Sequence, residues 1–180
     1  MMNIKMRNKG FTLIEMILVV GILGILAVGA IVALNPVAQF QKGNDVRRKS
    51  DLAQVQRALE AFYQDYGSYP IGNGSTGYLI NYMDKTQTPA VSVTIHWGSA
   101  WQPYMNLLPQ DPNSNKKYVY YSTGQSYYIY ASLDRGSSDP QACNKGTACS
   151  SIATNVVTSP CGTSVAMVCN YGVSSPDVKP

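Results

Sequence analysis

An apolar run near the N-terminus constrains this chain more than any other feature of its sequence. Residues 11–34 contain one charged side chain, that of Glu15. A helix of about 20 apolar residues, rising about 1.5 Å per residue, spans the hydrocarbon core of a bilayer. The run therefore predicts a membrane-spanning helix or a secretory signal. In a chain of 180 residues it leaves room for one modest domain.

Basic residues precede the run and indicate how it crosses the membrane. Lys5, Arg7 and Lys9 supply most of the net charge of +4, so the rest of the chain is too weakly basic to predict a specific nucleic-acid partner. A basic head before an apolar run is typical of an exported segment whose N-terminus stays in the cytoplasm. We therefore expect a single-pass protein of the inner (cytoplasmic) membrane, with its C-terminal domain outside.

Helical periodicity continues beyond the apolar run. Apolar side chains recur at steps of three and four residues, which places them on one helix face: Leu52, Val55, Leu59, Phe62 and Tyr66. The following Gly67-Ser68-Tyr69-Pro70 is a termination signal. We predict one long helix from Phe11 to Tyr66, with a transmembrane half over residues 11–34 and an amphipathic half over residues 35–66. A kink is expected at Pro36, whose ring clashes with the carbonyl four residues before it.

The remaining sequence predicts a small antiparallel sheet. Residues 67–117 are rich in turn formers and indicate a connecting region, with one candidate strand at 91–95. Residues 118–133 form two tyrosine-rich runs around a turn, which predicts a β-hairpin, and residues 165–168 are a further candidate strand. The tyrosines fit cross-strand packing, although such a ladder can also stack sugars or bases. Together with the helix, these elements indicate an α+β fold.

All four cysteines lie in the C-terminal region, residues 134–180: Cys143, Cys149, Cys161 and Cys169. An even number of cysteines downstream of an export signal indicates disulfides formed in an oxidising compartment. A structural metal site is less favoured, because the spacing contains no C-x-x-C pair. Three disulfide pairings are compatible with the sequence, which does not select one.

Other motifs give little support for catalysis or for a cofactor. His96 is the only histidine, and no nucleophile has a paired base within a recognisable motif, so we do not expect an enzyme. The stretch between Asp134 and Asp139 could offer carboxylate and carbonyl oxygens to calcium, but it lacks the spacing and the final glutamate of an EF-hand loop. A polar turn is the favoured interpretation there, and no other cofactor is expected.

The residues around the start of the apolar run resemble a known signal. Lys9-Gly10-Phe11-Thr12-Leu13-Ile14-Glu15 resembles the class III signal peptide of the type IV pilin and pseudopilin family. The resemblance implies that prepilin peptidase removes the leader, residues 1–10, by cutting between Gly10 and Phe11, and that it methylates the new amino group of Phe11. It also implies the pilin fold and self-association into a helical filament on an inner-membrane assembly platform.

A second resemblance lies ahead of the predicted hairpin. Residues 107–112 are similar to the region before the sheet in the major pseudopilin of type II secretion, although Asn113-Ser114 stands where pseudopilins tend to have Trp-Gly. The 134–139 stretch matches their calcium-binding loop only in part. Cysteines near the C-terminus, in contrast, are more typical of pilins.

The chemistry of Glu15 then has a specific interpretation. A lone carboxylate in hydrocarbon costs several kcal/mol unless it finds a partner. Cleavage after Gly10 would create a cationic amine on Phe11, and residues four apart on a helix lie about 6 Å apart along its axis. Glu15 could pair with its own amine, or with that of a neighbouring subunit, which would set the register of assembly. Alternatively, it lies in the headgroup interface.

Three functions follow, in order of preference. The first is a structural subunit of a type IV pilus-like filament, extracellular or periplasmic, in which Glu15 pairs with a subunit amine. The second is the major pseudopilin of a type II secretion system. The third is an adhesin or sugar-binding protein exported by an ordinary signal peptide, against which Glu15 and the length of the apolar run argue.

Overall fold

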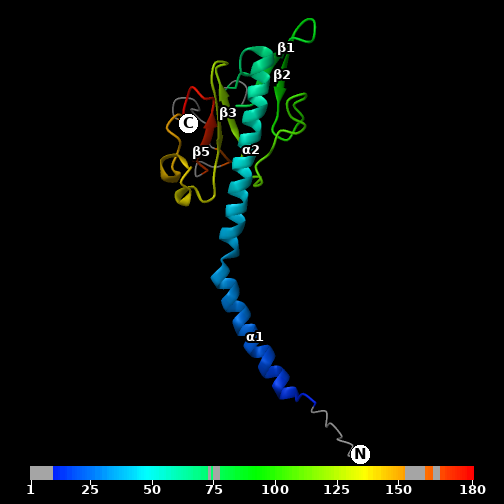
Figure 1. Ribbon diagram of the computed structural model, residues 1–180, viewed down its shortest axis with the longest axis vertical. Helices are drawn as coiled ribbons and strands as arrows, with labels where there is room; N and C mark the ends of the chain where they lie inside the picture. The colour runs from blue at the N-terminus through cyan, green and yellow to red at the C-terminus, as the bar shows by residue number, and fades with distance from the viewer. Residues whose placement is uncertain (1–9, 73, 75–77, 153–160, 164–166) are drawn as a thin grey trace, which may run out of the picture. The chain divides into compact units, whose positions relative to one another are not determined.

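The computed structural model describes residues 10–72, 74, 78–152, 161–163 and 167–180 (Figure 1). The chain divides into two compact units, one ending at Phe40 and one beginning at Gln41. Each unit is described by itself below.

The first unit contains helix α1, Leu13–Leu34, and the start of helix α2, Pro36–Tyr66. Helix α1 buries no side chain in the described part of the chain, and its large apolar side chains are exposed. By length and composition, the helical span from Leu13 to Tyr66 contains a segment able to cross a membrane. An apolar surface of this kind requires lipid or other apolar helices around it.

The two helices are separated by one residue, Asn35, which adopts a left-handed conformation (φ 42°). A residue before proline is disfavoured in the α region, and asparagine tolerates the left-handed region better than most residues. Pro36 then takes the first position of α2, where its missing N–H costs nothing. The side-chain Oδ1 and the carbonyl of Asn35 both accept from the N–H of Ala38, so Asn35 ends one helix and caps the next.

Helix α2 carries the apolar face on which the second unit is built. Its buried apolar stripe consists of Leu52, Val55, Ala58, Leu59 and Phe62. Burial of each large side chain among them contributes about 1.5–3 kcal/mol. The helix ends at Tyr66 because Gly67 adopts φ 70° and donates its N–H to the carbonyl of Tyr63.

Two antiparallel sheets accompany α2. The first has the order β3-β4-β5, formed by Val119–Ser122, Tyr127–Ala131 and Tyr171–Ser174. The second is the pair β1, Ile80–Asp84, and β2, Val91–Ile95. Short 3-10 turns lie at Gly136–Ser138 and Cys143–Gly146. The molecule thus has the α+β, pilin-like architecture indicated by the sequence: a long N-terminal helix, small antiparallel sheets and a disulfide-bearing C-terminal region.

Two strands occupy places where the sequence predicted none. Strand β1 lies within the expected connecting region, and its Asn81 and Asp84 disfavour strands by propensity. The candidate strand at 165–168 lies partly outside the described residues, and the strand in this part of the chain is β5, a few residues later.

The tyrosines of the β3–β4 hairpin mostly point into the core. Four of them are at most 2% exposed: Tyr118, Tyr120, Tyr127 and Tyr130. Their hydroxyls find partners inside the protein: Tyr120 donates to the carbonyl of Pro70 (2.7 Å) and Tyr127 to the carboxylate of Glu60 (2.9 Å). Buried aromatic rings with satisfied hydroxyls stabilise a core. This arrangement argues against these four residues as a platform for sugars or bases.

Candidate functional site

The N-terminal motif surrounds the first turn of α1. Thr12 is the N-cap residue, and its hydroxyl accepts from the backbone N–H of Glu15 (3.3 Å). The Glu15 carboxylate, through Oε2, accepts in return from the N–H of Thr12 (3.5 Å). This reciprocal pair is a capping box, and a negative charge in the first turn also interacts favourably with the helix dipole.

Gly10 and Phe11 lie just outside the helix, in exposed non-helical backbone. The sequence predicted a helix that begins at Phe11, whereas in this structure the cap at Thr12 starts the helix after Phe11. A peptidase can bind a peptide bond that lies in exposed backbone outside a helix. The geometry therefore leaves the Gly10–Phe11 bond accessible.

Thr12 is a residue of this site that sequence reasoning missed. The signal was present, because a threonine followed three residues later by a glutamate before an apolar run is the sequence pattern of a capping box. The carboxylate of Glu15 makes these contacts through Oε2, and Oε1 has no hydrogen-bond partner within the described residues. Glu15 can therefore cap its own helix and still accept from a further donor.

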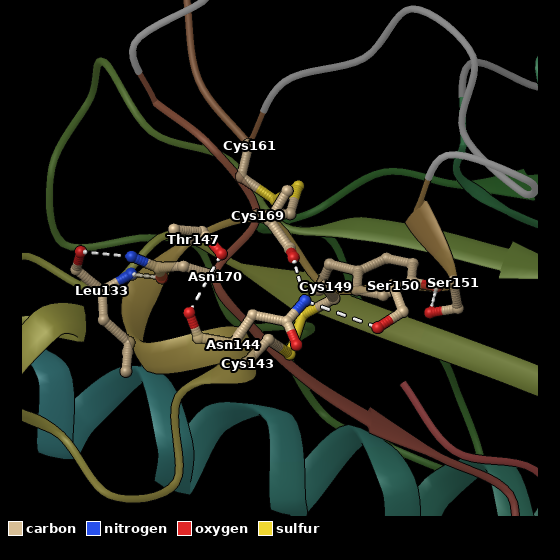
Figure 2. Close-up of a disulfide and its surroundings, with 12 residues drawn as sticks. Leu133, Cys143, Asn144, Thr147, Cys149, Ser150, Ser151, Cys161, Cys169 and Asn170 are labelled. Carbon is tan, nitrogen blue, oxygen red and sulfur yellow. Dashed lines mark hydrogen bonds between the residues drawn. A yellow bond between two sulfur atoms is a disulfide. The ribbon is translucent and has the colours of Figure 1, made fainter.

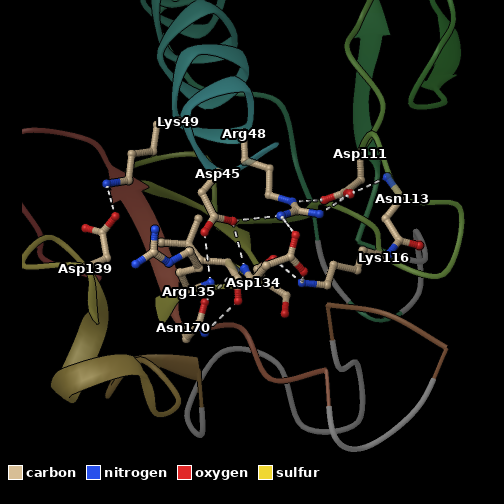
Figure 3. A network of polar contacts seen from close by, with 12 residues as sticks. Asp45, Arg48, Lys49, Asp111, Asn113, Lys116, Asp134, Arg135, Asp139 and Asn170 are labelled. Atoms are coloured by element: carbon tan, nitrogen blue, oxygen red, sulfur yellow. Dashed lines mark hydrogen bonds and ion pairs between the residues drawn. The ribbon is translucent and has the colours of Figure 1, made fainter. Parts of the chain in front are cut away.

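A second polar site is buried in the C-terminal unit, around Arg48 of α2 (Figure 3). The Arg48 side chain is 0% exposed. Its guanidinium donates through Nε and Nη2 to both oxygens of Asp111, at 2.8 and 2.9 Å. Its Nη1 donates to Asp45 (2.8 Å) and to Asp134 (2.7 Å). Bidentate and charge-assisted hydrogen bonds of this kind are the strong ones in proteins.

Further contacts extend this cluster, which we call the Arg48 cluster: Arg48, Asp45, Asp111, Asp134 and Lys116. The ammonium of Lys116 pairs with Asp134 and donates to the carbonyl of Ser132 (2.9 Å). The Asp45 carboxylate accepts from the N–H groups of Asp134 (2.7 Å) and Arg135 (2.9 Å). The cluster thus connects helix α2 to the loop before β3 and to the loop after β4.

The electrostatics of the cluster follow from these contacts. Burial by itself lowers the pKa of Arg48, but hydrogen bonds from its guanidinium to Asp111 and Asp134 raise that pKa above its ordinary value. Burial by itself raises the pKa of Asp134, but its bonds with Arg48 and Lys116 hold that pKa below its ordinary value. The charged forms are therefore the stable ones. Nearby, burial raises the pKa of Asp51, which accepts from the Tyr118 hydroxyl (2.8 Å).

The two candidate calcium ligands each contact a basic side chain. Asp134 belongs to the Arg48 cluster, and Asp139 pairs with Lys49. Among the described residues, no group of three or more histidine, cysteine, aspartate and glutamate side chains is placed to hold a metal ion. Calcium binding at Asp134 and Asp139 stays the less favoured alternative to a polar turn.

The four cysteines pair in sequence order, as Cys143–Cys149 and Cys161–Cys169 (Figure 2). The two bridges are held together by the backbone, because the N–H of Cys149 donates to the carbonyl of Cys169 (3.0 Å). In the chain-entropy picture, closing loops this short contributes about 2 kcal/mol each. The sequence could not select this pairing, since all three pairings satisfy the same count.

Two family models match this chain, one after the other. Residues 5–31 match the prokaryotic N-terminal methylation motif, and residues 35–148 match the family of type II secretion system (T2SS) protein G. The chain is 33% identical to the type II secretion system core protein G of Aeromonas hydrophila, over 67% of this chain and 78% of that protein.

Two further relatives carry the same name. The protein of Vibrio cholerae is 32% identical over 67% of this chain and 75% of its own length, and that of Escherichia coli is 27% identical over 66% and 75%. No solved structure matches the chain significantly.

Proposed function

Since the chain belongs to the type II secretion system protein G family, we propose that it is the major structural subunit of a secretion pseudopilus. The observation that carries the proposal is the order of two matches on one chain, the methylation motif over 5–31 followed by the protein G family over 35–148. The first match supplies the processing signal and the second the domain that is processed. The family is a structural one, consistent with a non-enzymatic subunit.

The structure supports an assembling role for α1. The helix exposes apolar side chains along its whole length, while the unit from Gln41 has a core of its own. Before assembly lipid would cover α1, with the N-terminus in the cytoplasm. After assembly the α1 helices of neighbouring copies would cover each other inside a periplasmic filament built on the inner-membrane platform.

Processing would prepare the chain for this assembly. Prepilin peptidase would cut the exposed bond between Gly10 and Phe11 and methylate the Phe11 amine. Glu15 would then accept from the amine of a neighbouring copy, for which its Oε1 is available among the described contacts. A carboxylate in an apolar surrounding gains most from such a pair, so the pair would fix the register of each incoming subunit.

The comparisons reverse the order of the two filament functions given by the sequence. The pilus subunit came first there, and the family match favours the pseudopilin. The feature that favours a pilus is the pair of C-terminal disulfides, which resembles the pilins. An exported adhesin is the least favoured, since it explains neither match.

Mass spectrometry of the mature N-terminus tests the proposal. We expect a chain that begins with N-methylated Phe11, and a start near Ala30 or Ile31 would overturn it in favour of an ordinary signal peptide. Deletion of the gene then separates the two filaments. Loss of secretion across the outer membrane, with secreted proteins retained in the periplasm, supports the pseudopilus. Loss of surface filaments with normal secretion supports a pilus.

A further inference from the structure

A groove lies beside the C-terminal end of α2, next to the β1–β2 turn. Its volume is about 500 Å³. Its lining includes three aromatic rings, two carboxylates, one ammonium and one amide: Tyr66, Tyr82, Tyr104, Asp65, Asp84, Lys85 and Gln102. We call it the tyrosine groove.

The chemistry of the tyrosine groove suits a cation. Asp65 is exposed and accepts from the Tyr104 hydroxyl (2.8 Å). Asp84 accepts from the N–H (2.9 Å) and the hydroxyl (2.7 Å) of Thr86 and from the amide of Gln87 (3.1 Å), contacts that hold its pKa below the ordinary value. Tyrosine faces carry negative potential and attract ammonium and guanidinium groups. Rings and carboxylates therefore act in the same direction.

The chain's own Lys85 shows that the groove accepts an ammonium. Its Nζ lies 5.7 Å from the centre of the Tyr66 ring, near the outer limit of about 6 Å for a cation–π contact. One lysine at that distance does not neutralise both Asp65 and Asp84. The groove retains excess negative charge.

A basic hollow lies at the other end of this unit, near the start of α2. Its volume is about 390 Å³, and it is lined by three cations and two carboxylates: Lys42, Lys49, Arg135, Asp45 and Asp139. Asp45 and Asp139 are engaged, the first by Arg48 and the second by Lys49. Within the described part of the chain, the side chains of Lys42 and Arg135 have no carboxylate partner. The basic hollow retains excess positive charge.

The two complementary surfaces cannot meet within one molecule. Lys42 and Asp65 belong to one continuous helix, and at 1.5 Å per residue they lie about 35 Å apart. Contact between them therefore requires two copies. In a filament whose copies all point the same way, each interface is heterologous, so it joins two different patches of the subunit, as these two surfaces are.

Resting on the proposed filament function, we propose that the tyrosine groove of one copy receives the Lys42 and Arg135 side chains of a second copy stacked on it in the same orientation. The tyrosine faces and the two carboxylates bind the cations, and the fit specifies which ends of the subunits meet. The α1 helices hold the filament together, and this contact sets the axial position of the units from Gln41 onward, which we call the outer units.

Site-specific photo-crosslinking in cells that produce the full chain and its assembly machinery tests the proposal. A photoreactive residue replaces Gln102, which is exposed and lines the groove. We expect a crosslinked dimer whose partner peptide contains Lys42 or Arg135. The double variant Lys42→Glu/Arg135→Glu should lower its yield by about tenfold, as expected for loss of desolvated cation–π and charge contacts. Adding Asp65→Lys to that variant should restore part of the yield.

Lys117→Glu is the matched control, because this exposed lysine lines neither surface and should leave the yield unchanged. The docking proposal is overturned if no dimer forms, if the crosslinks map to other peptides, or if the double variant crosslinks as the wild type does. Filament sedimentation and the mature N-terminus, measured on the same cells, report separately on the proposed function. Processed, sedimenting filaments without the crosslink reject only the docking contact.

Discussion

Helices α1 and α2 are consecutive, yet they differ in how their charged side chains are compensated. Helix α1 has one carboxylate in an apolar surface, and within the described residues that carboxylate contacts its own N-cap residue but no cation. Helix α2 buries Asp45 and Arg48 and supplies counter-charges for both from its own chain. A buried charge must be compensated in either case. The comparison teaches that the buried charges of the unit from Gln41 are compensated within one molecule, whereas α1 exposes an apolar surface that requires lipid or other apolar helices around it.

The largest expected effect comes from removing the buried cation of α2, Arg48. Arg48→Met should destabilise the C-terminal unit by about 3–5 kcal/mol, because it leaves buried carboxylates without their cation. Denaturant unfolding of the full chain in detergent, followed by near-ultraviolet circular dichroism, measures the change. Arg47→Met is the matched control: Arg47 is 62% exposed and its contact with Asp51 is 3.9 Å long, so we expect a change below about 0.5 kcal/mol. Similar losses of unfolding free energy in the two variants would show that the Arg48 cluster adds little to the stability of the unit.

A smaller effect, of a different kind, is expected from Glu15. Glu15→Leu should leave the unfolding of the outer unit unchanged. It should weaken subunit association by about thirtyfold, the equivalent of one charge-assisted hydrogen bond of about 2 kcal/mol. Sedimented filament per cell measures this loss.

Glu15→Gln sharpens that test, because glutamine keeps the capping box with Thr12 but removes the charge. Loss of filaments in both variants assigns the role to the charge. Normal assembly of the glutamine variant would refute the charge pair and leave a capping role.

The free energy of unfolding of the outer unit should change with pH by less than the Arg48→Met effect. The direction of the change should reverse within the acidic range. Ion pairs hold the pKa of Asp134 below its ordinary value, so their stabilisation is present above the unfolded pKa and is lost as the pH falls through the folded pKa. Burial raises the pKa of Asp51, so its protonation favours the fold as the pH falls towards the unfolded value. We therefore expect the denaturant concentration at the unfolding midpoint, measured from about pH 7 to about pH 3, to decrease once the pH is below about 4. Asp51→Asn should remove any increase of the midpoint as the pH is lowered towards that value. A midpoint that increases continuously down to pH 3 would contradict this account.

The smallest effect is expected from calcium. Asp134 and Asp139 are already paired with Arg48, Lys116 and Lys49, so an added cation gains little. Calcium should shift the melting temperature of the full chain by less than about 1 °C, with magnesium as the control. A larger shift specific to calcium would show that the two carboxylates can leave their basic partners and bind the ion.

The features that could be predicted from the sequence are local ones. The apolar run, the stripe from Leu52 to Tyr66 and the stop at Gly67 depend on neighbouring residues, and the helices follow them. The partners of Arg48 could not be predicted in this way, because Asp111 and Asp134 lie 63 and 86 residues further along the chain. The order of two cysteine pairs and the weak strand β1 likewise depend on tertiary contacts.

The disulfides have a consequence for how the protein is made. Each bridge joins neighbouring cysteines, separated by 6 and 8 residues. In the proposed orientation the chain leaves the cytoplasm with its C-terminal region last. Cys149 then meets Cys143 before the other two cysteines emerge, which leaves Cys161 to pair with Cys169, and short loops close fastest. Correct oxidation is then the default result of the order of export, and maturation of this protein should depend on an oxidant but not on a disulfide isomerase.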